Sequence, residues 1–507
     1  MSAPPTQTPR TALTQCSRAQ IITGAAIAAG IGAAAAMVIT RFLRKRVHRR
    51  AAAEAAALAA PITRSELIFM GTGSSTGVPR AMCVANPESD CEVRTNRGDK
   101  AVREWAYVIA HRLSPCLCVA QTCRMSMIGP SELNRNWRGN PSLLIRFVAP
   151  GSASWDSSSS TDSSLPTVRN IQIDICKTFL SSALRLYPRY GVRSLDSVVI
   201  THDHADALLG MDDIRSMQSF DETTLKAATV PVHVTERTLA SMRAKFHYLV
   251  PKQVGSSLAT DSASRSAPHT PAAHSAHAGS VIVERKVAQL DFEVIRPFVP
   301  FRTCGLEILP LPVMHGEDYV SLGFLFGKAA SGACLYVSDV TRIPEATWQF
   351  LCTGVLPTPP QQAEGADIDD ARATQEWFER FNHASAHPLP KHQSKWSVLP
   401  DLPAAPSRSP ASAASSGSSA SSVAPRIALL VVDALFPAMD HNTHFSLPQA
   451  LQFIERLQPD RALITGMSDL FEWHRDNAEL VRKKAAGEIT VDVQLAYDGL
   501  RIPNFDL

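Results

Sequence analysis

The sequence lacks an excess of charge of either sign. Its 507 residues carry 50 Lys and Arg against 47 Asp and Glu, which leaves a net charge of only +3. So small a net charge argues neither for nor against a nucleic-acid partner. We expect no DNA partner, and an RNA partner stays open. The ten cysteines lack the spacing of a secreted disulfide framework, and no cleavable secretory signal stands out. Both absences favour a reducing compartment for the main part of the chain.

Acidic residues are absent before Glu54, and one stretch of this region carries no charge at all, Ala19–Thr40. A helix of about 20 apolar residues spans a bilayer. The basic stretch "RFLRKRVHRR" follows directly. Because positive charge stays on the cytosolic side, these features predict a membrane anchor with the rest of the chain in the cytosol. An Arg-rich start without acids also suits mitochondrial import, which stays the alternative.

Composition divides the chain into four parts. They are a tail (1–18), the transmembrane or targeting segment (19–40), a basic and Ala-rich linker (41–63) and a globular domain (64–507). The domain contains insertions near 93–121, 151–166, 256–280 and 353–424. The last three are rich in Ser, Ala, Pro and His and poor in large apolar residues, so we expect them to be disordered.

Short apolar stretches dominate the globular part and predict strands. Examples are "NPSLLIRFV", "NIQIDI", "SVVIT", "SLGFLFG", "ACLYVSDV", "RIALLVVDAL" and "RALITGM". Two amphipathic stretches, "FLSSALRLYPRYG" and "SLPQALQFIERLQ", predict helices. This mixture predicts an α/β sandwich of two sheets covered by helices.

A pair of histidines follows the predicted strand in "SVVITHDHADALLG". His202 and His204 are two residues apart, and in extended backbone such side chains point the same way. Two imidazoles can therefore meet one zinc-like ion, which accepts imidazole and carboxylate ligands. Asp206 follows two residues later, where its carboxylate could bind a second ion or orient a water molecule.

Three residues further along the chain occupy similar positions. His315 follows the apolar strand of "LEILPLPVMHG", Asp339 ends the strand of "ACLYVSDV", and His444 precedes a predicted helix in "HNTHFSLPQAL". Side chains at the ends of strands and helices are where binding and catalytic residues collect. The sequence therefore predicts one metal centre built from these segments.

The order of these motifs resembles that of the metallo-β-lactamase fold hydrolases. The sequence carries "GTGSSTGVP", then H-x-H-x-D, a histidine, an aspartate and "HFSL". The branch that it resembles contains the phosphoribosyl cyclic phosphodiesterase of phosphonate breakdown and the tRNA 3′-end endonuclease. The resemblance covers 64–507 without the insertions. It implies an αββα sandwich and a metal-dependent hydrolase that uses Zn²⁺, or Mn²⁺.

The resemblance also implies a role for each residue. The implied metal ligands are His202, His204 and His315 for the first ion, Asp339 as a bridge and Asp206 for the second ion. His444 would contact a phosphate and act as general acid, and Asp206 would also orient the attacking water.

Two positions depart from the branch and weaken the second metal site. Ala207 stands where the branch has a histidine, and Gly466 in "TGMSD" stands where another ligand is expected. Asp206 and Asp339 alone suit Mg²⁺ or Mn²⁺ better than zinc. His474 in "DLFEWH" could replace the missing ligand, and a surface histidine is an equal alternative. We therefore expect one bound ion and a second site that is weak or rebuilt.

The branch often carries a small structural zinc site made from spaced cysteines. Cys83 and Cys91 occupy that region, and deletion of residues 93–121 would create "CETC", which ends at Cys123. Valine can be encoded as GTG and glutamine as CAG, so Val93 and Gln121 are compatible with the usual first and last bases of an intron. Residues 93–121 are therefore either a retained intron, which transcript reads would reveal, or a genuine insertion.

The function favoured by these observations is a metal-dependent phosphodiesterase acting on a small-molecule or other phosphodiester substrate. A thioester or RNA hydrolase of the same fold is one alternative, although the sequence shows no basic, Gly-rich arm of the kind that RNA-processing relatives carry. A non-catalytic scaffold tethered to a membrane is the other.

Overall fold

The computed structural model of the protein describes residues 62–85, 120–128, 131, 133–149, 167–221, 226–250, 287–328, 332–357 and 424–507. All of them belong to one compact unit, Pro61–Leu507. The segment 19–40, Cys91 and most of the four insertions lie outside these ranges, so what the sequence predicts for them stays a prediction. No helix within the described ranges is long and apolar enough to cross a membrane.

Seven strands form the first sheet, in the order β16-β1-β2-β3-β4-β7-β8. Their bounds are β1 Glu66–Gly71, β2 Ser142–Val148, β3 Val168–Ile173, β4 Ser197–Val199, β7 Val230–Val234, β8 Leu290–Val294 and β16 Arg501–Ile502. Strands β3, β4, β7 and β8 run parallel to one another, whereas β1 pairs antiparallel with both of its neighbours. A separate antiparallel pair is formed by β5 (Phe220–Asp221) and β6 (Lys226–Ala227).

Seven strands also form the second sheet, in the order β15-β14-β13-β12-β11-β10-β9. Their bounds are β9 Phe301–Thr303, β10 Leu306–Met314, β11 Val320–Phe326, β12 Ala333–Val337, β13 Ile427–Asp433, β14 Arg461–Thr465 and β15 Asp492–Leu495. Strands β12 to β15 are parallel. The nearly unbroken apolar run "IALLVVD" of β13 is typical of a parallel strand that is buried on both faces.

Helices are short and connect or follow the strands. Their bounds are α2 Ala81–Ala85, α4 Ala120–Ser126, α5 Phe179–Tyr190, α6 Ala205–Leu208, α7 Glu236–Lys245, α8 Glu345–Thr353, α10 Leu447–Leu457 and α11 Trp473–Ala485, with a 3₁₀ helix η2 at Met211–Met217. Helix α10 begins at a capping box in which Ser446 and Gln449 satisfy each other's backbone N–H groups. It ends at Gln458, whose left-handed backbone stops the helix.

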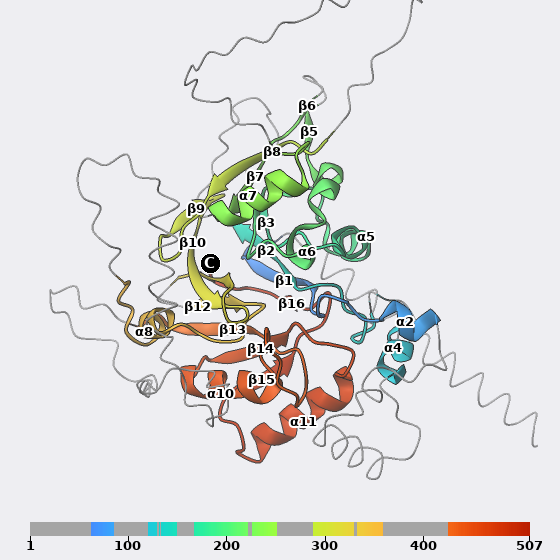
Figure 1. Ribbon diagram of the computed structural model, residues 1–507, viewed down its shortest axis with the longest axis vertical. Coiled ribbons are helices and arrows are strands. Elements are labelled where there is room, and N and C mark those ends of the chain that lie inside the picture. Colours follow the sequence, from blue (N-terminus) through green and yellow to red (C-terminus); the bar gives the residue numbers. More distant parts are fainter. Residues whose placement is uncertain are drawn as a thin grey trace, which may run out of the picture. The chain divides into compact units, whose positions relative to one another are not determined.

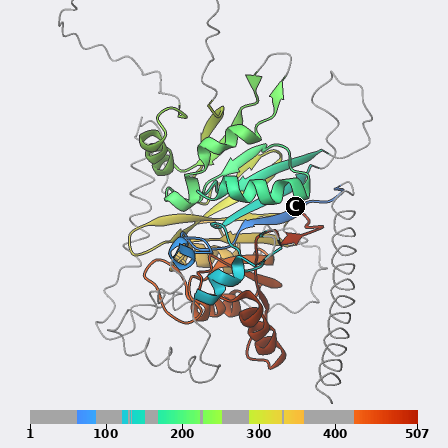
Figure 2. The same cartoon turned by 90° about the vertical axis from the view of Figure 1, so that its right-hand side faces the viewer.

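The two sheets pack face to face around one apolar core. Phe69 and Ile145 of the first sheet belong to the same buried cluster as Phe324 and Val431 of the second. The other face of the second sheet packs against α8, α10 and α11, which lie beside its orange and red strands in Figure 1, through residues such as Trp348. Seen from the side in Figure 2, the green helices and the orange-red helices lie on opposite sides of the strands. The predicted αββα sandwich is confirmed, and the helices α7, α8 and α11 are additions that the sequence patterns did not predict.

Side chains of the predicted centre follow the carboxyl ends of strands from both sheets. His202 comes after β4 of the first sheet, whereas His315 follows β10 and Asp339 follows β12 of the second. Ligands of α/β proteins commonly bind at the carboxyl ends of parallel strands. The packing of the sheets therefore decides whether these residues meet.

Candidate metal centre

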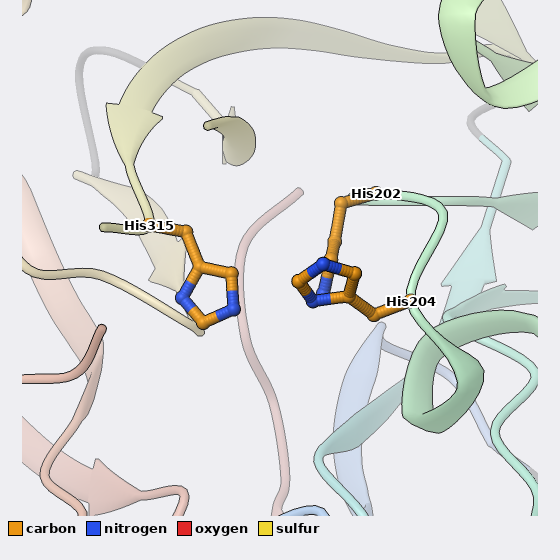
Figure 3. A group of neighbouring side chains, drawn as sticks. All are labelled: His202, His204 and His315. Atoms are coloured by element: carbon orange, nitrogen blue, oxygen red, sulfur yellow. The ribbon is translucent and has the colours of Figure 1, made fainter. Parts of the chain in front are cut away.

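Three imidazoles predicted as ligands of one ion face one another in the structure. The ring centroids of His202 and His204 are 4.7 Å apart, and His315 lies 5.4 Å and 5.0 Å from them. Figure 3 shows His202 and His204 on one loop and His315 approaching from the other side. The candidate ligand atoms of all three lie within 4.8 Å of one another. One ion could therefore contact a nitrogen of each ring.

Hydrogen bonds fix the orientation of two of these rings. The Thr201 hydroxyl donates to Asp174 at 2.9 Å and so accepts from Nδ1 of His202 at 2.8 Å. Nδ1 of His315 donates to the Thr443 carbonyl at 2.7 Å. Each ring thus keeps its Nε2 lone pair free, which is how metal-binding histidines are usually held.

The donor set fits a zinc-like ion. Nε2 of His202 is buried and has no hydrogen-bond partner within the described residues. A buried polar atom without a partner costs free energy unless a ligand satisfies it. Burial, opposed by Asp339, lowers the pKa of His202 to about 3, and burial also lowers the pKa of His204. Both rings are therefore neutral, as metal binding requires.

Asp339 lies at the same centre. Its carboxylate and ring nitrogens of His315 and His444 lie within 4.8 Å of one another. Burial favours the neutral acid, but the imidazoles of His202, His444 and His315 hold its pKa below the usual range. Asp339 has a φ of 52°, a left-handed conformation that Asp tolerates better than most residues. An ionised carboxylate beside the three imidazoles completes a set of ligand types that zinc accepts.

His444 is held by a buried carboxylate that the sequence patterns did not single out. Nδ1 of His444 donates to Oδ2 of Asp433 at 2.6 Å. Burial disfavours the charged ring, yet the attraction of Asp433 raises the pKa of His444 to about 9. Asp433 ends β13 much as Asp339 follows β12, so an acid at the end of an apolar strand was the signal available in "RIALLVVDAL". The pair presents a fixed, protonated imidazole to the centre.

The same carboxylate explains why Gly466 cannot carry a ligand. Gly466 has a φ of 70°, and a Cβ built on it would lie 1.8 Å from Oδ1 of Asp433. Asp433 therefore occupies the space in which a side chain at this position would begin. Ala207 is different, since it lies in α6 in a right-handed helix and is merely small and buried.

Restoring a histidine at these two positions is expected to have opposite outcomes. We expect Ala207→His to raise bound zinc from about one ion toward two, because an imidazole joins Asp206 and Asp339. Gly466→His should instead lower the free energy of unfolding by about 2–5 kcal/mol through backbone strain and overpacking. Elemental analysis and urea denaturation measure the two effects. Two tightly bound ions in the unmodified protein would show that the second site is not depleted.

The two remaining predicted residues differ in their electrostatic relation to the centre. Asp206 is half-buried in the first turn of α6, two residues after His204, and burial together with the charge of Asp339 raises its pKa. Among the residues that the structure describes, it belongs to none of the clusters of potential ligands. His474 is exposed at the start of α11 and packs edge-on against Trp473 at 5.1 Å. It is in none of the clusters of potential ligands found within the described ranges.

A second cluster of potential ligands contains two of the three predicted cysteines. Cys83 of α2, Cys123 of α4 and Asp469 are buried, with ligand atoms within 4.8 Å of one another. The Cys123 thiol donates to Asp469 at 3.7 Å. Asp469 ends "TGMSD" and was not predicted. Two thiols and a carboxylate are zinc ligands, so the prediction of a structural site now includes Asp469.

Comparisons with known proteins agree with the order of the motifs. A family model described as β-lactamase superfamily domain matches residues 169–353, which include five of the predicted residues but not His444. This match confirms the resemblance to the metallo-β-lactamase fold hydrolases. A fold of this kind generally binds divalent metals, in keeping with the histidine cluster.

Other similarities are weaker. An octanoyltransferase from Porphyromonas gingivalis is 27% identical over 162 residues, or 32% of this chain, and this chain spans only 25% of that protein. A diphosphatase structure of the PhnP family is 19% identical, with 88% of this chain and 99% of that chain covered and a TM-score of 0.45. The human short-form tRNase Z is 10% identical, with 86% and 98% covered and a TM-score of 0.36. Structural similarity at this level carries no argument about substrate.

Proposed function

We propose that the protein is a metal-dependent phosphodiesterase with one tightly bound ion, Zn²⁺ or Mn²⁺, held by His202, His204 and His315. The observation that carries the proposal is the buried Nε2 of His202, which has no partner within the described residues and faces two further imidazoles. When bound, such an ion lowers the pKa of a water molecule to about 7 and polarises the phosphoryl oxygen.

The chain's own carboxylates complete the centre on the side of the attacking water. Asp339 lies with His315 and His444 and supplies negative charge to the ion. Asp206 lies in the first turn of α6, two residues after His204, and the charge of Asp339 raises its pKa; it would accept a hydrogen bond from the attacking water and orient it. With Ala207 and Gly466 in place, these two acids are the ligands left for a second ion, and they would hold it weakly.

His444 acts on the side of the leaving group. Asp433 fixes Nδ1 at 2.6 Å, so Nε2 carries the second proton of the charged ring. A protonated imidazole can donate a hydrogen bond to a phosphoryl oxygen and transfer its proton to the departing oxygen.

The protonated state of His444 favours a phosphodiester over a thioester as the substrate. An alkoxide is a poor leaving group and gains much from a proton. A thiolate gains little, because a thiol has a pKa of about 8.5 and leaves readily as the anion. A buried carboxylate devoted to keeping His444 protonated is therefore better matched to phosphodiester cleavage.

Parallel assays of the full-length protein test the proposal. The chain would be stripped of metal, reloaded with Zn²⁺ or Mn²⁺, and given a phosphodiester, an RNA 3′ end and an acyl thioester, the last because a partial relative is an octanoyltransferase. We expect metal-dependent hydrolysis of the phosphodiester at least about tenfold faster than of the thioester. Faster thioester or RNA cleavage would replace the proposed substrate class. A folded, metal-loaded protein without turnover on any of them would support the scaffold alternative.

A further inference from the structure

His204 differs from the other histidines of the centre in how it is held. His202, His315 and His444 each have Nδ1 fixed by a hydrogen bond, to Thr201, to the Thr443 carbonyl and to Asp433 respectively. The described residues offer no such bond to His204, which is exposed at the N-terminus of α6. A metal ligand without an outer partner would sample several rotamers, and each unproductive rotamer lowers the affinity for the ion.

An aromatic ring lies against His204 instead. Tyr319 stacks on it with ring centroids 4.6 Å apart and an interplanar angle of 29°. Tyr319 also lies 6.0 Å from His202 and 6.0 Å from His315, edge to face in both cases. It therefore contacts all three rings of the candidate centre and covers the face of the one that lacks a hydrogen bond.

Tyr319 is itself anchored at both ends. Its carbonyl accepts from the backbone N–H of His315 at 2.8 Å, which ties it to the ligand of the second sheet. Its hydroxyl donates to the carboxylate of Asp203 and accepts from the Asp203 N–H at 3.1 Å. Asp203 lies between His202 and His204 in the chain, so this contact reaches the ligands of the first sheet. One side chain thus joins the two halves of the centre.

Basic side chains reinforce this contact. Lys245 donates to the Asp203 carbonyl at 2.6 Å and lies 3.7 Å from its carboxylate. The Arg237 guanidinium lies over the Tyr319 ring, 4.2 Å from its centroid. Both come from α7, a helix to which no role in the metal centre is otherwise assigned. Four contacts besides the stacking therefore hold Tyr319 in place. They are those with the N–H of His315, the carboxylate and the N–H of Asp203, and the guanidinium of Arg237.

We propose that Tyr319 is a positioning residue that holds His204 in its metal-binding orientation by stacking, and that the Tyr319–Asp203 contact sets the spacing between the ligands of the two sheets. The proposal rests on the proposed metal site. It predicts a defined order of zinc affinities: the unmodified protein binds most tightly, Tyr319→Phe keeps the stacked ring but loses the Asp203 contact, and Tyr319→Leu loses both.

Competition with a chromophoric chelator measures these affinities in the full-length protein. We expect Tyr319→Leu to weaken zinc binding about 10–100-fold, the usual effect of losing an outer partner of a metal ligand. The zinc affinity of Tyr319→Phe should lie between that of Tyr319→Leu and that of the unmodified protein. Tyr248→Leu is the matched control, since Tyr248 is an exposed tyrosine whose ring is 5.7 Å from that of His247, outside the cluster. It should leave the affinity unchanged.

A second measurement separates positioning from general stability. The thermal midpoint of the zinc-free Tyr319→Leu variant should stay within a few degrees of that of the zinc-free unmodified protein, whereas the rise caused by zinc should shrink with the affinity. Equal zinc affinity in Tyr319→Leu and the unmodified protein would overturn the positioning role and leave the proposed function standing. Equal zinc affinity in Tyr319→Phe and Tyr319→Leu would overturn the role of the stacked ring. Absence of zinc binding in the unmodified protein would overturn both proposals.

Discussion

His204→Ala is expected to release the metal from the purified protein. The unmodified chain should carry about one transition-metal ion per molecule, because the candidate ligand atoms of His202, His204 and His315 lie within 4.8 Å of one another. Removing His204 leaves two imidazoles, which hold a divalent ion poorly. We expect a loss of affinity greater than the ~100-fold that follows removal of an outer hydrogen bond. Elemental analysis after dialysis against a weak chelator measures it.

The matched control for this result is His474→Ala. His474 is also exposed and was the other histidine that the sequence offered to the centre, but it packs beside Trp473. Its removal should leave metal content unchanged. A folded, unmodified protein without metal would contradict the proposed function. Loss of one ion from a two-ion protein in His474→Ala would instead show that His474 rebuilds the second site in solution.

His444→Asn is expected to produce the largest loss of turnover without loss of metal. Asparagine keeps a donor for Asp433 near the position of Nδ1, so the buried carboxylate stays paired, but it presents no acid at the position of Nε2. Loss of a general acid lowers kcat about 10²–10⁴-fold when the leaving group needs a proton. We therefore expect a loss of this size on a cyclic ribose phosphate, whose leaving group is an alkoxide.

A comparison of leaving groups sharpens this test. On bis(p-nitrophenyl) phosphate the leaving group departs as a stable anion, so the loss in His444→Asn should be at least about tenfold smaller. His441→Asn serves as the control, because His441 lies on the same loop with its ring 5.6 Å from that of His444 and is bonded to Thr443. It should change kcat little on either substrate. Equal losses on both substrates in His444→Asn would show that His444 binds the phosphate without donating a proton.

Local patterns in the sequence determined the elements and most candidate residues. The two-residue spacing of His202 and His204 places both side chains on one side of an extended chain, whatever surrounds them. Asp339 was recognisable because it follows an apolar strand, and α10 because its sequence is amphipathic. Such signals depend on neighbours within a few residues, so they can be recognised without knowledge of the fold.

Only the tertiary structure decided which distant groups meet. Tyr319 reaches His204 because β4 and β10 belong to sheets that pack face to face, and Cys123 meets Asp469 across 346 positions of the chain. The 1.8 Å approach that excludes a side chain at Gly466 depends on the position of β13 beside β14. His474, left undecided by its sequence context, is exposed at the start of α11 and belongs to none of the clusters of potential ligands within the described ranges. Periodicity specifies which face of an element is buried, but contacts between elements depend on register and sheet packing, to which no short stretch of sequence refers.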